Sequence, residues 1–89
     1  GVLFVLPLAL GDRVCIAGDF NGWQGARHEM RRNPDRGVYE LEIPMEPGEY
    51  QYRLVIDGRW SVDPYAGQCA LSSSGEPNSV VRVPARAGA

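Results

Sequence analysis

Apolar and polar residues alternate over short runs of this chain, and glycine, proline, asparagine and aspartate separate the runs. In residues 50–56, tyrosine, leucine and isoleucine occupy every second position, and Gln51, Arg53 and Val55 fall between them. Because successive side chains of a strand point to opposite faces, we expect Arg53 to point away from the core. No stretch has a convincing 3.6-residue period, so the pattern predicts a chain dominated by strands.

The runs predict an all-β fold, an immunoglobulin-like sandwich of six to eight short antiparallel strands. The pair Asp57-Gly58 predicts a tight hairpin, because a type I′ turn needs positive φ at both central positions. Longer loops are expected at residues 19–36 and 63–77. The expected strands are 2–6, 13–18, 38–43, 50–56, a return strand through Arg59, Trp60 and Val62, and 79–83.

The length of 89 residues fits one domain, which we place at residues 1–84, followed by a flexible tail at 85–89. A chain this short buries only about 60–65% of its unfolded surface, so we expect a thin, continuous core. The net charge of −2 and the 22% of charged residues are typical of an ordinary globular domain. They do not suit a nucleic-acid-binding chain, which carries a strong basic excess.

The first ten residues are apolar, but they contain Pro7 and fall far short of the ~20 residues of a membrane-spanning helix. We therefore expect a first strand here, no membrane association and a cytoplasmic location. Cys15 and Cys69 form neither a disulfide framework nor a spacing typical of zinc sites. We expect free thiols and no bound metal.

Trp23 and Trp60 each stand beside a tight turn instead of inside an alternating apolar strand. A turn position favours exposure, but tryptophan is heavily buried on average, so the pattern leaves open that either indole caps the core. On the exposed wall of a sheet, flat aromatic faces cover the C–H patches of glucose rings, and planar donors or amides bind the hydroxyls. Tryptophan, arginine and asparagine are the residue types that suit such a site.

Four blocks follow one another along the chain: GDFNGW at 18–23, PGEYQYR at 47–53, VIDGRW at 55–60 with DP at 63–64, and NSVV at 78–81 with Val83. In this order they resemble the family-48 carbohydrate-binding modules, found in the AMP-activated protein kinase beta subunit and at the N-terminus of glycogen branching and debranching enzymes. The resemblance covers nearly the whole chain. It implies an early-set, immunoglobulin-like domain that binds α-glucan such as glycogen or starch. One block alone would be weak evidence, because turn chemistry produces it.

Carried over by position, the resemblance implies that Trp23 and Trp60 stack on glucose rings. It also implies that Arg53 donates hydrogen bonds to hydroxyls and that the Asn78 side chain bonds another sugar. The role implied for Arg53 agrees with the outward orientation that the alternation predicts.

The chain departs from the kinase-type modules at three positions of the implied site. Those modules have lysine where Arg53 stands, a bulky leucine near Ser74 that pushes into the glucan spiral, and threonine near Glu76. Either the bulky residue is lost, which makes binding weaker or differently selective, or Leu71 replaces it from a loop one residue longer.

The same sequence argues against catalysis. A glycosidase needs two carboxylates about 5–9.5 Å apart, one of them held protonated. The acids here lie in turns, like Asp57, or on a solvated strand face, like Glu40 and Glu42. The single histidine, His28, offers no catalytic triad, and no glycine-rich phosphate loop precedes a helix. We expect no enzymatic activity and no cofactor.

Two functions follow from these observations. The first is a non-catalytic module that binds glycogen, starch or malto-oligosaccharide. The alternative is a structural N-terminal domain of a larger glucan-processing enzyme, which packs on the catalytic domain or a partner subunit and has little sugar affinity. The missing bulky residue at Ser74 motivates the alternative, which requires an apolar patch where the partner docks.

Overall fold

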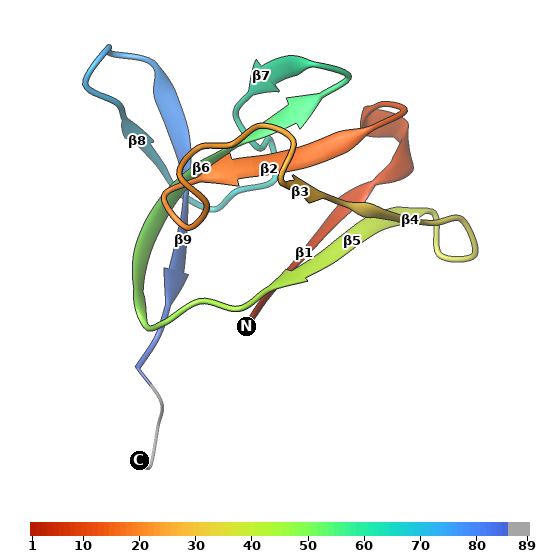
Figure 1. Cartoon of the computed structure of the whole chain (residues 1–89), viewed down its shortest axis with the longest axis horizontal. Coiled ribbons are helices and arrows are strands. Elements are labelled where there is room, and N and C mark those ends of the chain that lie inside the picture. The colour runs from red at the N-terminus through yellow and green to blue at the C-terminus, as the bar shows by residue number, and fades with distance from the viewer. Residues whose placement is uncertain (86–89) are drawn as a thin grey trace.

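The computed structural model describes residues 1–85, in which nine strands form two antiparallel sheets (Figure 1). The elements are β1 (Val2–Pro7), the 3-10 turn η1 (Leu8–Leu10), β2 (Val14–Gly18), β3 (His28–Glu29), β4 (Arg31–Asn33), β5 (Val38–Ile43), β6 (Gly48–Ile56), β7 (Arg59–Ser61), β8 (Cys69–Leu71) and β9 (Pro77–Val83). The smaller sheet has the order β1-β5-β4. The larger has the order β3-β2-β6-β9-β8, and β7 pairs with β6 as a hairpin.

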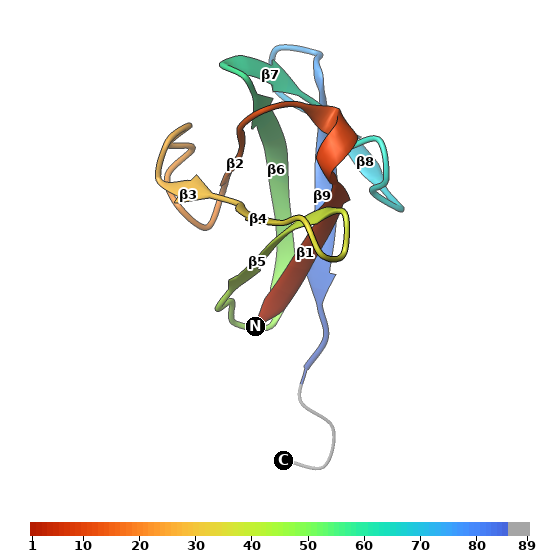
Figure 2. The same cartoon turned by 90° about the vertical axis from the view of Figure 1, so that its right-hand side faces the viewer.

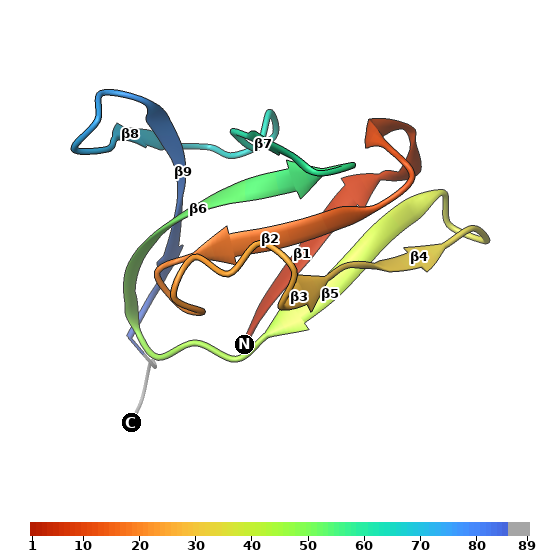
Figure 3. The same cartoon turned by 45° about the horizontal axis from the view of Figure 1, so that its top comes forward.

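The long strand β6 organises the larger sheet. One edge of its second half pairs with β2, and the opposite edge pairs first with β9 and then with β7. Figure 2 and Figure 3 show that the β6–β7 hairpin and the tip of the β8–β9 hairpin lie at the end of this sheet away from the N-terminus. The two hairpins thereby flank the exposed face of β6.

The predicted all-β, antiparallel, immunoglobulin-like architecture is confirmed. The count differs, because within residues 1–85 there are nine strands and the pattern predicts six to eight. The additional strands β3, β4 and β8 are two or three residues long and lie inside the expected loops. Such lengths are too short to show a period of two, so they leave no signal in the sequence.

The main core lies between the two sheets. Tyr52 and Leu54 of β6 face it, and the Phe4 ring of β1 meets the Tyr52 ring edge to face, with 5.2 Å between ring centroids. Burying these side chains supplies most of the stabilisation, at about 25 cal/mol per Å² of apolar surface. The buried core residues are Phe4, Leu6, Val14, Ile16, Met30, Tyr39, Ile43, Tyr52 and Leu54.

A second, smaller apolar cluster lies on the opposite face of the larger sheet. It consists of Cys15, Ala17 and Val55, and the Trp23 side chain packs against it. All five residues of β2 are buried for this reason, since both faces of that strand are covered. The outer face of the larger sheet therefore has a small apolar surface on which the Trp23 side chain packs.

The predicted domain boundaries at residues 1–84 remain a prediction. The flexible tail expected at 85–89 lies, from residue 86 onward, outside the residues that the structure describes. Over residues 1–85, no helix has the length and apolar character needed to cross a membrane.

A buried polar network joins β6 to the loop that follows β7. The Tyr52 hydroxyl donates to Asp63 Oδ2 at 2.6 Å, and the Tyr65 amide donates to Asp63 Oδ1 at 2.9 Å. The backbone N–H of Asp63 donates to Ser79 Oγ at 2.7 Å. Burial, together with the bond to the Asp63 carboxylate, raises the pKa of the Tyr52 phenol well above its ordinary value.

We expect Tyr52→Phe to lower the free energy of unfolding by about 1–3 kcal/mol, because the buried Asp63 carboxylate loses its hydroxyl donor. The substitution should also change the response to alkali. In wild type above pH ~10, the Tyr52 phenol ionises in the unfolded state but stays protonated in the folded state, so the unfolded state binds fewer protons and the free energy of unfolding falls. Tyr52→Phe lacks this phenol, so its free energy of unfolding should fall less steeply with pH. Urea unfolding from pH 7 to 11 measures both effects.

Tyr50→Phe is the matched control for this experiment. Its hydroxyl donates to the Glu46 carbonyl at 2.7 Å in an exposed setting, so its removal should cost little stability. If the free energy of unfolding fell equally steeply with pH in wild type and in Tyr52→Phe, the raised pKa of the Tyr52 phenol would be contradicted.

Candidate functional site

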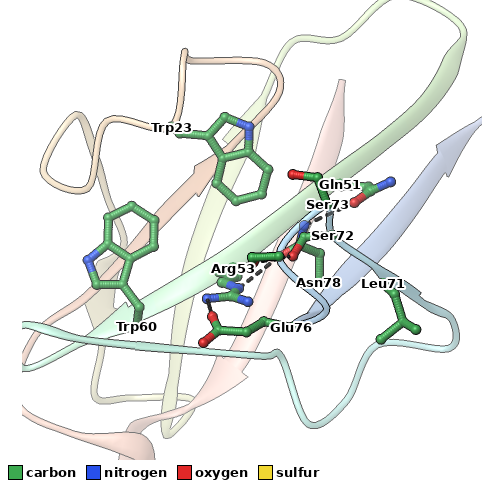
Figure 4. A pocket seen from close by; sticks show the side chains of 10 residues that line it. Trp23, Gln51, Arg53, Trp60, Leu71, Ser72, Ser73, Glu76 and Asn78 are labelled. Atoms are coloured by element: carbon green, nitrogen blue, oxygen red, sulfur yellow. Dashed lines mark hydrogen bonds and ion pairs between the residues drawn. The ribbon is translucent and has the colours of Figure 1, made fainter.

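An open groove of about 450 Å³ lies on the outer face of the larger sheet (Figure 4). Figure 4 shows the two indoles at one side, Leu71 at the other, and polar side chains between them. The lining residues are Trp23, Gln51, Arg53, Trp60, Leu71, Ser72, Ser73, Ser74, Glu76 and Asn78. The structure thus brings every residue that the sequence nominated for a site into one groove.

The floor of the groove is a chain of polar side chains on β6 and β9. Arg53 Nε donates to Asn78 Oδ1 at 2.7 Å, and Asn78 Nδ2 donates to Gln51 Oε1 at 2.9 Å. On the other side of the guanidinium, Arg53 Nη1 lies 3.0 Å from Glu76 Oε2. Arg53 faces away from the main core, as the alternation predicts, and it is held by two partners in a fixed orientation.

Trp23 ends a tight turn that the buried Asn21 side chain organises. Asn21 Oδ1 accepts from the Gly18 amide at 3.1 Å, and Asn21 Nδ2 donates to the Ile16 carbonyl at 2.9 Å. Gly22 and Trp23 both have positive φ, 66° and 60°. This conformation is strained for a tryptophan, and the Asn21 bonds offset the cost.

The Trp23 indole is half-buried. It packs against the outer apolar cluster, and its Nε1 donates to Asp19 Oδ1 at 3.1 Å, while the ring also lines the groove. The Trp23 ring thus caps a small apolar cluster and also lines the groove, and its stacking on a sugar stays a prediction.

Trp60 is 46% exposed and follows the predicted hairpin, where Asp57 and Gly58 have φ of 50° and 83°. The Asp57 carboxylate fixes this turn by accepting from the Asp12 and Arg13 amides. The loop at Gly25 lies directly against the indole, so a Cβ added there would come within 2.9 Å of Trp60 Cζ2. Trp60 is consequently partly exposed, and its ring leaves no room for a side chain at position 25.

The rim opposite the indoles is the tip of the β8–β9 hairpin. The Ser72 amide donates to the Glu76 carbonyl at 2.8 Å, and the Gly75 amide donates to the Ser72 carbonyl at 2.9 Å. Ser74 contributes a hydroxyl, which lies 2.8 Å from Ser72 Oγ. Leu71 is 73% exposed and lines the groove, so an apolar side chain is present on this rim although position 74 lacks one.

Sequence reasoning missed three lining residues, Gln51, Ser72 and Ser73. Gln51 could have been found, because the alternation that turns Arg53 outward also turns Gln51 outward. The two serines lie in a hairpin tip whose shape comes from backbone hydrogen bonds, and no periodic signal marks them.

The lining of the groove is suited to binding an uncharged, polyhydroxylated ligand and not to catalysing a reaction. It offers flat aromatic surface beside fixed donors and acceptors, which is the chemistry of sugar recognition. Among residues 1–85, Glu76 is the one carboxylate that lines it, and hydrolysis of a glycosidic bond uses two. Over residues 1–85, no group of three or more His, Cys, Asp or Glu side chains is placed to hold a metal ion.

Comparison with known proteins gives a consistent result. The model of the family described as the glycogen recognition site of AMP-activated protein kinase matches residues 8–88. The 1,4-alpha-glucan branching enzyme GlgB of Thiobacillus denitrificans is 39% identical over 89 residues, which cover 94% of this chain and 12% of the enzyme. The GlgB of Burkholderia lata is 41% identical over 83 residues, covering 89% of this chain and 11% of the enzyme.

A third relative, GlgB 1 of Rhizobium etli, is 36% identical over 77 residues, covering 80% of this chain and 10% of the enzyme. The chain thus spans about a tenth of the length of these relatives. The family that matches is a recognition domain, which confirms the prediction of a binding module without catalytic activity of its own. The chain belongs to the family of glycogen-recognition domains typified by AMP-activated protein kinase, the family-48 carbohydrate-binding modules.

Proposed function

We propose that the groove binds a segment of α-glucan, as glycogen, starch or malto-oligosaccharide. The convergence of two tryptophans with the Arg53–Asn78 pair on one open face carries this proposal. The groove volume of about 450 Å³ lies within the usual range of ligand pockets, about 300–1,000 Å³.

In this proposal the two indoles stack on successive glucose rings. Arg53 and Asn78 hydrogen-bond the hydroxyls, and Nε2 of Gln51 adds a donor beside them. Leu71 contributes apolar contact from the opposite rim, and Ser74 and Glu76 contribute polar groups. The fixed orientation of the guanidinium lowers the entropy that binding must remove, so a shallow site can reach micromolar to millimolar affinity, roughly −8 to −4 kcal/mol.

The proposal extends to the organisation of the protein. Residues 1–84 act as one domain, and in a longer chain like the branching enzymes it resembles, this domain keeps the catalytic part close to its polymer. A cytoplasmic location fits the two cysteines, which are free thiols in the structure, Cys15 buried and Cys69 exposed.

A second candidate function, packing on a catalytic domain or partner subunit, is favoured by a different surface. Leu3 and Val5 of β1 are 62% and 48% exposed on the outer face of the smaller sheet. Two such neighbours on one edge strand form an apolar patch of the kind that marks an interaction surface. This patch lies on the other sheet from the groove, so the two functions are separable.

Truncation of either indole should weaken glucan binding without unfolding the protein. We expect Trp23→Ala and Trp60→Ala each to raise the Kd for maltoheptaose at least about tenfold, which corresponds to about 1.4 kcal/mol. Isothermal titration with circular dichroism of each variant measures affinity and folding together.

Two variants serve as controls for this titration. Trp60→Phe keeps a flat ring and should lose less affinity than Trp60→Ala. Tyr65→Ala removes an equally prominent aromatic, 66% exposed, that lies outside the groove, and it should bind like wild type. If folded wild-type protein bound neither maltoheptaose nor glycogen, the proposal would be refuted.

Leu71→Ala tests whether the rim contributes apolar contact. We expect a several-fold weaker Kd for maltoheptaose and an unchanged melting temperature, because the side chain is exposed. Leu3→Ala is the matched control, a leucine of similar exposure on the other sheet. Equal affinities for the two variants would show that Leu71 has no role in binding.

The packing function predicts binding in trans. The chain should bind a branching enzyme of Thiobacillus denitrificans from which the matching segment has been removed, with a micromolar Kd. Leu3→Ser combined with Val5→Ser should abolish that binding and leave the maltoheptaose titration unchanged. Failure of wild type to bind in trans, or binding that the double substitution does not affect, excludes this surface as the interface.

A further inference from the structure

Of the residues that the structure describes, two charged side chains line the groove, Arg53 and Glu76, and the others that line it are uncharged. A guanidinium alone in a groove would attract anions, since it binds phosphate, sulfate and carboxylate groups through paired hydrogen bonds. The charge of the floor therefore depends on the carboxylate that accompanies the guanidinium.

Glu76 is placed to cancel this charge. Its Oε2 lies 3.0 Å from Arg53 Nη1, and the Arg53 side chain is 17% exposed while that of Glu76 is 66% exposed. The guanidinium is thus partly withdrawn from water, where counterions screen it less. The carboxylate lies on the solvent side of the pair and meets an incoming ligand first.

A neighbouring hollow of about 310 Å³ shares this pair. Arg53, Trp60 and Glu76 line both hollows, and Ser61, Val62 and Pro77 complete the second one. No further charged side chain lines the second hollow in the part of the chain that the structure describes. In residues 1–85, one ion pair therefore supplies the charged side chains that line both hollows.

We propose that Glu76 is a specificity-determining residue, which restricts the groove to uncharged glucan and rejects glucan that carries phosphate or sulfate esters. The inference rests on the proposed glucan-binding function and deepens it. An ester group near Arg53 has to displace the Glu76 carboxylate or lie beside it, and like charges in a partly desolvated groove repel. A neutral hydroxyl meets no such penalty and finds the remaining guanidinium N–H groups available.

The test is Glu76→Gln, titrated with maltoheptaose and with maltoheptaose that carries one phosphate ester. The amide keeps the shape of the side chain and an oxygen that accepts from Arg53, so only the charge changes. Because Glu76 itself lines the groove, the result is the ratio of the two Kd values measured on the same variant, and not the Kd for neutral maltoheptaose alone. Relative to neutral maltoheptaose, the affinity for the phosphorylated sugar should rise at least about tenfold over wild type at low ionic strength and fall again with added salt.

Two further variants isolate the cause. Glu49→Gln removes the same charge from another ion pair between β6 and β9, with Arg82 at 3.2 Å, and Glu49 lies outside both hollows. It should not bind the phosphorylated sugar better than wild type. Adding Arg53→Gln to Glu76→Gln should remove the gain, because the attracting cation is then absent.

The outcomes separate the inference from the function on which it rests. A gain in Glu76→Gln that Glu49→Gln lacks supports the inference. Wild type that binds both sugars equally, or a Glu76→Gln variant without any gain, overturns the inference and leaves glucan binding intact. Folded wild type that ignores neutral maltoheptaose overturns the proposed function, and the inference fails with it.

Discussion

The register of β6 between β2 and β9 is the constraint on which the rest of the structure depends. Tyr52 pairs with Gly18 of β2 on one edge and with Ser79 of β9 on the other. From that position the alternation sends Tyr52 and Leu54 into the core and Gln51 and Arg53 onto the outer face. A slip by one residue would bury the guanidinium and expose the core side chains, so folding and site formation are specified together.

Much of this arrangement could be predicted from the sequence, because it depends on local signals. Alternation in residues 50–56 indicated which way Arg53 points, and Asp57-Gly58 indicated the hairpin that carries Trp60. The strands β3, β4 and β8 could not be predicted, since two or three residues pair only because neighbouring strands are already in place. The same limit hid the two serines of the hairpin tip.

Contacts between residues that are distant in the chain also could not be predicted from the sequence. Arg53 lies on β6 and Glu76 lies in the turn just before β9, and only the β6–β9 pairing brings their charged groups to 3.0 Å. The two roles of Trp23 were equally hidden, because the outer apolar cluster under its ring forms from β2 and β6 together. The resemblance pointed to residues that line one groove, whereas the hydrogen bonds between them follow only from the fold.

The tip of the β8–β9 hairpin is closed by its own backbone hydrogen bonds, from Ser72 to Glu76 and from Gly75 to Ser72, and it lies apart from the core between the sheets. Changes in the length or composition of this turn therefore cost little folding free energy. In evolutionary terms, a substitution in this turn meets a weaker constraint from folding than a substitution in the core. Descendants of one ancestral domain can acquire new ligand preferences here by a few substitutions, without passing through unstable intermediates.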